Sequence, residues 1–118
     1  MAEQATENEL APERVSELTD AQLVDVRTSE EYEASHIAGA RQLPLDELQA
    51  AAGELDRERP VVFYCRSGDR STLAVDAFRA SGWDAYAITG GLVAWAEQGL
   101  PLEPEGAAVA HHSGLPKP

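Results

Sequence analysis

Short apolar runs alternate with helix-like patterns along most of the chain. The runs at residues 23–26, 40–43, 61–65 and 85–88 predict strands, and Leu10 opens a further short edge strand. Helical spacing and capping residues predict helices over residues 12–18, from Thr28 or Ser29 onward, and over residues 46–55, 71–81 and 92–98. Such alternation is typical of an α/β fold with a mostly parallel five-stranded sheet flanked by helices on both faces.

The run VVFYC at residues 61–65 is the most apolar of the five expected strands. A near-continuous apolar strand is typical of a strand buried on both faces of a parallel sheet. We therefore place it at the centre of the sheet. Ligands of such sheets bind beyond the carboxyl ends of the strands, and Cys65 stands at that end of this strand.

The polar and apolar pattern also divides the chain into three parts. Residues 1–9 are polar and acidic and predict a flexible arm, while residues 10–102 have the size and pattern of one domain. After Leu102 the composition shifts to Pro, Gly, Ala and His, so residues 103–118 predict a flexible tail. His111 and His112 lie in this tail, where we expect solvated side chains rather than metal ligands.

The charge balance excludes several classes of partner. Nine Lys and Arg stand against 21 Asp and Glu, giving a net charge of −12. Nucleic acids and anionic membranes bind basic faces, so neither is an expected partner. No apolar run reaches the roughly 18–20 residues that span a bilayer, and the acidic start has no signal-peptide pattern. We expect a monomer in the cytoplasm.

Cys65 is the only cysteine in the chain. A lone cysteine can form neither an internal disulfide nor, with the scattered histidines, a zinc site that takes four ligands. We expect no metal and no cofactor. A covalent adduct on Cys65 would have no resolving thiol on its own chain, so the adduct would have to leave to another molecule.

The segment after Cys65 has the composition of an anion-binding loop. It reads RSGDRS and leads into a predicted helix, so backbone N–H groups and the helix dipole would face the sulfur. Together with Arg66 and Arg70, they favour a thiolate, which is the nucleophilic form of cysteine. A lone cysteine is more commonly a small buried hydrophobe, but the polar loop, the glycine and two of only nine basic residues argue for a nucleophile here.

Three blocks of sequence, in order, resemble the rhodanese family in its single-domain form. LVDVRTSEEYEASHIAGARQLP at residues 23–44 is similar to the family's D-x-R, E-[FY], G-H-I-x-G-A and N-[IL]-P pattern. CRSGDRS at residues 65–71 resembles its active-site loop, and ITGGLVAWAEQGLPLE at residues 88–103 its closing block. Ser35 stands where the family usually has Gly, and Gln42 where Asn is common. The resemblance covers roughly residues 10–102 and implies a rhodanese-like three-layer sandwich.

The resemblance implies a sulfurtransferase with Cys65 as the catalytic residue. Cys65 would take a sulfane sulfur from thiosulfate or a persulfide, carry it as its own persulfide, and pass it to a thiol or cyanide. Small sulfur donors, thiol acceptors and a persulfidated donor protein are the expected partners. The loop residues expected to bind the donor are Arg66, Ser67, Gly68, Asp69, Arg70 and Ser71.

Two other functions remain open at this point. Related Cys-loop phosphatases and arsenate reductases place an arginine six residues after the cysteine, whereas Arg70 lies five after Cys65. The shorter loop predicts a nest sized for one sulfur atom rather than for a phosphate. A non-catalytic adaptor that docks a partner is the other alternative, although the complete loop with its cysteine argues against it.

Three more residues, Asp25, Arg27 and His36, have a predicted role in the fold rather than in catalysis. Asp25 and Arg27 match the D-x-R pattern, and Arg27 could pair with Glu31 four residues later across a helix start. His36 is expected to cap or pack a turn. Trp83, which follows Gly82, is expected to be partly exposed.

Asp69 lowers the positive charge of the loop. The side chains of Arg66, Asp69 and Arg70 sum to +1, or to zero with a Cys65 thiolate. A loop with so little net charge predicts modest affinity for dianionic thiosulfate and favours a persulfide as donor.

Overall fold

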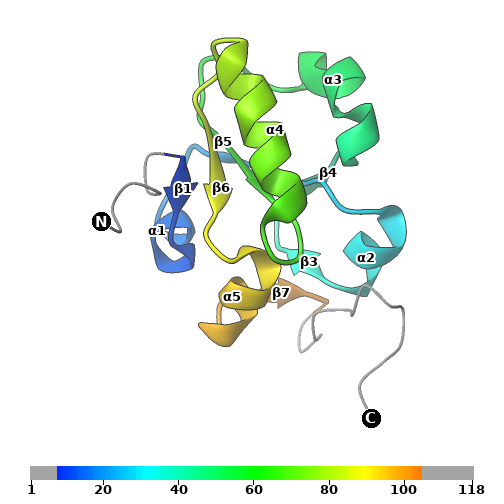
Figure 1. Ribbon diagram of the computed structural model, residues 1–118. Coiled ribbons are helices and arrows are strands. Elements are labelled where there is room, and N and C mark those ends of the chain that lie inside the picture. The colour runs from blue at the N-terminus through cyan, green and yellow to red at the C-terminus, as the bar shows by residue number, and fades with distance from the viewer. Residues whose placement is uncertain (1–7, 105–118) are drawn as a thin grey trace.

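A computed structural model describes residues 8–104 and has a five-stranded parallel sheet at its centre (Figure 1). The strands lie in the order β1-β6-β5-β2-β4, and each neighbouring pair is parallel. This confirms the predicted α/β fold and the predicted number of strands. The strand bounds are Glu9–Leu10 for β1, Gln22–Asp25 for β2, Arg41–Gln42 for β4, Val61–Tyr64 for β5 and Ala85–Ile88 for β6.

Strand β5 is central because all of its side chains are apolar enough to be buried. Val61 and Phe63 pack into the apolar cluster on one face, and Val62 and Tyr64 pack into the cluster on the other. This alternation follows from the two-residue repeat of a strand. Strands β2 and β6 pair with β5 on either side, so the carboxyl end of β5 lies in the middle of one edge of the sheet.

Helices cover both faces of the sheet, as the alternating pattern predicts. Residues of α1 (Pro12–Ser16) and α5 (Gly91–Glu97) pack against one face, and residues of α3 (Leu48–Ala51) and α4 (Asp69–Ala80) against the other. The helix predicted over residues 46–55 is broken into the 3₁₀ turn Leu45–Glu47, α3 and the 3₁₀ turn Ala52–Glu54. Helix α2 (Ser29–Ala34) follows β2. None of the helices within residues 8–104 is long and apolar enough to cross a membrane.

A small second sheet was not predicted from the sequence. Strand β3 (His36–Ile37) pairs antiparallel with β7 (Leu102–Glu103), which closes the domain from its C-terminal side. Glu103, which the composition assigned to the tail, is therefore part of this sheet. Residues 1–7 and 105–118, including His111 and His112, lie outside the described residues.

Trp83 is buried, so the prediction that it is partly exposed is wrong. The residue is 9% exposed and packs in the same apolar cluster as Phe78, with their ring centroids 4.9 Å apart. The guanidinium of Arg57 lies over the indole, 4.7 Å from the ring centroid. The apolar cluster and the stacked arginine together cover a ring that local sequence alone would leave in solvent.

Candidate active site

The turn from β5 into α4 places Cys65 at the carboxyl edge of the sheet. We call residues 65–70 the Cys65 loop. It begins directly after Tyr64 and leads into α4, whose N-cap is Gly68. Gly68 has a φ of 119°, which residues with a Cβ rarely adopt. This glycine therefore lets the chain reverse within a few residues and brings the start of α4 back over the sulfur.

Two backbone N–H groups donate to the Cys65 sulfur. The N–H of Gly68 donates to Sγ at 3.1 Å, and the N–H of Ser71 donates at 3.4 Å. The Cys65 thiol donates to the Ser71 hydroxyl at 3.6 Å, and this hydroxyl donates to the Gly68 carbonyl at 3.2 Å. Several N–H groups that converge on one atom form an anion nest, which stabilises negative charge at that atom. The loop therefore supplies donors that can stabilise negative charge on this sulfur.

The first turn of α5 determines which way the loop faces. The N–H groups of Leu92 and Val93 donate to the carbonyls of Cys65 and Arg66, at 2.9 and 3.0 Å. Because α5 binds these two carbonyls, they point away from the sulfur, and the N–H groups of Gly68 and Ser71 point toward it. Gly91 permits the contact, because a Cβ at this position would lie 2.6 Å from both carbonyl oxygens. The sequence did not predict this contact, because it joins two segments that are far apart in the chain.

Arg70 forms an ion pair with Glu31 of α2, not with a loop residue. Its Nη1 lies 2.9 Å from Oε1 and its Nη2 lies 3.1 Å from Oε2, in a two-point contact. Burial favours the neutral acid, but the hydrogen bonds from Arg70 and Thr28 and the charge of Arg70 lower the pKa of Glu31 to about 2. The hydrogen bond to Glu31 raises the pKa of Arg70. The predicted pair between Arg27 and Glu31 is therefore wrong.

Arg27 pairs instead with Asp25, two residues before it. Nε and Nη2 of Arg27 lie 2.9 and 2.7 Å from the two carboxylate oxygens, and both side chains are fully buried. The Arg27 guanidinium also donates to the carbonyl of Ser35. Tyr64 completes the cluster. Its hydroxyl donates a hydrogen bond to the Asp25 carboxylate and accepts one from the Ile37 N–H at 3.0 Å. Burial, followed by the charge of Asp25, raises the pKa of Tyr64. The structural role predicted for Asp25 and Arg27 fits this geometry.

The seven predicted site residues are brought together but differ in exposure. Cys65 is only 1% exposed and belongs to an apolar cluster. Burial alone would suit an inert core cysteine, but a purely apolar pocket would not supply N–H donors to the sulfur. The donors therefore favour the nucleophilic interpretation. Ser71 is also buried, Arg66, Gly68 and Arg70 are partly buried, and Ser67 and Asp69 are exposed.

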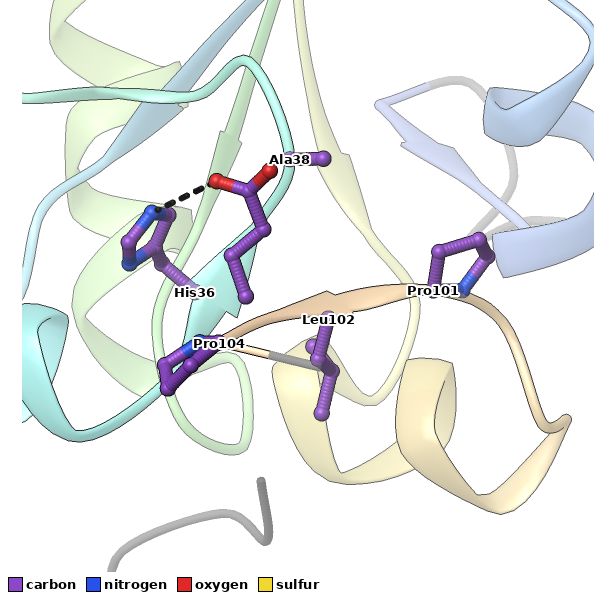
Figure 2. A pocket seen from close by; sticks show the side chains of 6 residues that line it. His36, Ala38, Pro101, Leu102 and Pro104 are labelled. Carbon is purple, nitrogen blue, oxygen red and sulfur yellow. Dashed lines mark ion pairs between the residues drawn. The ribbon is translucent and has the colours of Figure 1, made fainter. Parts of the chain in front are cut away.

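A hollow beside the β3–β7 sheet lies apart from the Cys65 loop (Figure 2). Its walls are His36, Ala38 and residues 101–104, so no residue of the Cys65 loop lines it. The His36 ring donates from Nδ1 to the Tyr32 carbonyl at 2.7 Å and stacks on the Tyr32 ring, which fits the predicted packing role. Its Nε2 faces Glu103 at 3.6 Å (Figure 2). Within residues 8–104, no three His, Cys, Asp or Glu side chains are placed to hold a metal ion.

Comparisons with known proteins identify the family of this chain. The model of the rhodanese-like domain family matches residues 10–98. A sulfurtransferase from Allochromatium vinosum is 37% identical over 85% of this chain and 95% of its own length. An HTH-type transcriptional regulator from Mycobacterium tuberculosis, Rv0324, is 41% identical over 83% of this chain, which spans 44% of that longer protein.

Solved structures show the same fold. The crystal structure of a rhodanese-related protein from Thermoplasma volcanium superposes with a TM-score of 0.79 at 26% identity, over 83% of this chain and 99% of the other. The family match covers the strand, the Cys65 loop and the start of α5 that orients it. The chain therefore belongs to the rhodanese-like domain family.

Proposed function

We propose that the protein is a sulfurtransferase that carries sulfur as a persulfide on Cys65. The observation that carries the proposal is the pair of backbone N–H groups, from Gly68 and Ser71, that donate to the Cys65 sulfur. These groups are fixed before a donor arrives, so they stabilise charge on sulfur without reorganisation. The name of the Allochromatium vinosum relative is consistent with this activity.

The transfer is a displacement at sulfur in two halves. The Cys65 thiolate attacks the outer sulfur of a donor; the donor's S–S bond breaks and its electron pair leaves with the remainder. With thiosulfate, the products are the Cys65 persulfide anion and sulfite. In the second half, an external thiolate or cyanide attacks the outer persulfide sulfur, and the electron pair of that S–S bond returns to Cys65. Neither half needs an outside oxidant or reductant.

The lone cysteine supports this proposal. A second thiol nearby would attack the persulfide and form a disulfide with the release of sulfide. Cys65 is the only cysteine of the chain, so its persulfide awaits an external acceptor. Thiols, cyanide and a persulfidated donor protein are the partners that we propose. The cytoplasmic location and the monomeric state remain predictions.

The direct test is the mass of the protein before and after each donor. Incubation with thiosulfate or a small hydropersulfide should add about 32 Da to the intact chain, and cyanide should remove it. Cys65→Ser is the control, because its hydroxyl is too weak a nucleophile to accept sulfur. If the wild type gains no mass from any donor, the sulfurtransferase proposal fails and the adaptor alternative replaces it.

A second test separates sulfur transfer from phosphate chemistry. The Cys65 loop already has two N–H groups within hydrogen-bond distance of the sulfur itself, and it is one residue shorter than the phosphatase type. We therefore expect no hydrolysis of an aryl phosphate. Hydrolysis that disappears in Cys65→Ser would instead favour the phosphatase alternative.

A further inference from the structure

The charge at the Cys65 loop depends on a residue outside the loop. Both terminal nitrogens of Arg70 are engaged by the two oxygens of Glu31, which belongs to α2. The guanidinium is near enough to interact electrostatically with Cys65. An anionic donor that is to contact both terminal nitrogens on the edge that Glu31 occupies must therefore displace the Glu31 carboxylate.

Glu31 is held in place from its other side. Its Oε1 accepts the backbone N–H and the hydroxyl of Thr28, each at 3.1 Å, and its own N–H donates to the Thr28 hydroxyl. This capping box fixes the first turn of α2. The side chain of Glu31 is 12% exposed, against 33% for Arg70. The carboxylate is thus both anchored and charged, since its pKa of about 2 keeps it ionised at neutral pH.

The ion pair changes the net charge that a donor meets. Arg66, Asp69 and Arg70 sum to +1, and the Glu31 carboxylate brings the sum to zero. With the Cys65 thiolate, the total is −1. Attack on thiosulfate then gathers three negative charges on the reacting atoms, whereas attack on an uncharged hydropersulfide gathers one. In a partly buried site, each further charge without a counterion is costly.

We propose that Glu31 is a specificity-determining residue that selects donors with little charge around the transferable sulfur. By holding Arg70 in a neutral pair, it disfavours dianionic thiosulfate and leaves hydropersulfides of small thiols as the preferred donor class. The transfer from such a donor balances: the Cys65 thiolate and R–S–SH give R–S⁻ and Cys65–S–SH, with the proton kept on the outer sulfur. This inference rests on the proposed sulfurtransferase function and adds the substrate class.

The test compares the rate of sulfur transfer to Cys65 from two donors, thiosulfate and the hydropersulfide of a small uncharged thiol. Loading is followed by intact mass in quenched single-turnover samples over a range of donor concentrations. Glu31→Gln keeps an acceptor for the capping box but removes the charge. Glu30→Gln, at an exposed position of the same helical turn, removes one charge without the contact to Arg70.

We expect Glu31→Gln to raise the rate constant for thiosulfate about tenfold, mainly through a lower half-saturating concentration, because one charge-assisted contact becomes available. The hydropersulfide rate should change less than about threefold, and Glu30→Gln should follow the wild type. The double variant Glu31→Gln/Arg70→Gln should lose the gain. Glu31→Asp keeps the charge but is too short for the same two-point contact, so it should give a smaller gain and serves if Glu31→Gln does not fold.

Three outcomes would overturn the inference about Glu31 and leave the proposed function intact. The first is an unchanged ratio of the two donor rates in Glu31→Gln, and the second is an equal fall of both rates in that variant. The third is a higher thiosulfate rate that persists in the double variant without Arg70. A wild type that takes sulfur from neither donor would instead refute the proposed function itself. Thermal melting of each variant shows whether a rate change reflects folding.

Discussion

Two arginines at the same edge of the sheet have opposite surroundings. Arg27 follows β2 and binds Asp25 with both side chains fully buried, whereas Arg70 lies at the end of the Cys65 loop, is 33% exposed and binds Glu31. Each arginine makes a two-point contact with one carboxylate, and the hydrogen bonds of the two contacts are of similar length. Their environments, rather than their hydrogen bonds, therefore distinguish them.

This difference in burial indicates a structural role for the Arg27 pair and a role in donor binding for the Arg70 pair. The pair of Arg27 joins residues two apart and ties β2 to the Ser35 carbonyl and, through Tyr64, to β3. It orders the backbone beside the site but has no exposed surface for a donor. The pair of Arg70 joins residues 39 apart in the chain, and Arg70 belongs to the Cys65 loop, so the pair can respond to a donor at the proposed nucleophile. Disruption of the first should alter stability, and disruption of the second should alter donor choice.

Removal of the buried guanidinium should have the largest effect on stability. Arg27→Met fills similar space but leaves Asp25 charged, buried and without its partner, which costs about 3–5 kcal/mol in comparable cases. Denaturant unfolding at neutral pH would measure the loss. Asp25→Asn should also be strongly destabilising, and the two changes together should cost less than their sum because the residues are in contact.

An exposed pair is the matched control for this prediction. Arg41 and Glu54 form a 3.1 Å ion pair in which the side chains are 52% and 57% exposed. Arg41→Ala should change the free energy of unfolding by less than about 1 kcal/mol, as is usual for surface pairs. Equal losses for Arg27→Met and Arg41→Ala would mean that burial does not set the importance of these pairs.

A change at Gly91 should perturb the Cys65 loop and leave the Arg27 pair untouched. Gly91→Ala adds strain at a φ of 63° and places a methyl 2.6 Å from the Cys65 and Arg66 carbonyl oxygens. We expect roughly 2 kcal/mol of destabilisation and a more than tenfold slower sulfur transfer, because the N–H donors would be displaced. Denaturant unfolding and single-turnover loading measure the two effects.

Gly99→Ala provides the control for Gly91→Ala. Gly99 also has a positive φ, 75°, but nothing lies within 4 Å of the position a Cβ would take. Gly99→Ala should lower the free energy of unfolding by about 1–2 kcal/mol through backbone strain alone. Its rate of sulfur transfer per folded molecule should equal that of the wild type. Equal transfer rates in the two variants would show that contact with α5 does not orient the loop.

The sequence predicted the sheet and the position of Cys65 at its carboxyl edge, but not the contacts between distant segments. The VVFYC run indicated the central strand, and the polar glycine loop indicated Cys65 as a candidate nucleophile, because both signals are local. Strands β3 and β7 are two residues long, too short for any periodicity, and they pair across more than half of the chain. The Glu31 contact was missed for a similar reason: spacing suggested a neighbour four residues away, but the fold brings Arg70 closer.

The different environments of Glu31, which is bound to Arg70, and of its exposed neighbour Glu30 lead to a prediction that depends on pH. A carboxyl whose pKa falls from its usual 4.5 to about 2 on folding stabilises the protein fully above pH 4.5 and loses this contribution as the pH falls toward 2. Partial exposure screens the pair, so we expect roughly 1–2 kcal/mol at neutral pH.

Urea unfolding of wild type and Glu31→Gln between pH 7 and pH 2.5 measures this contribution. The difference in unfolding free energy should stay constant from pH 7 to about 5.5 and then shrink as the pH falls, because a protonated Glu31 carboxyl resembles the uncharged amide of the variant. Glu30→Gln is the control and should differ less from the wild type, since Glu30 is exposed. A Glu31→Gln difference that does not shrink in acid would mean that the Arg70 contact adds no stability to the charged form. Arg70 would then not be held as a neutral pair, and only the buried Arg27 would remain fixed at this edge of the sheet.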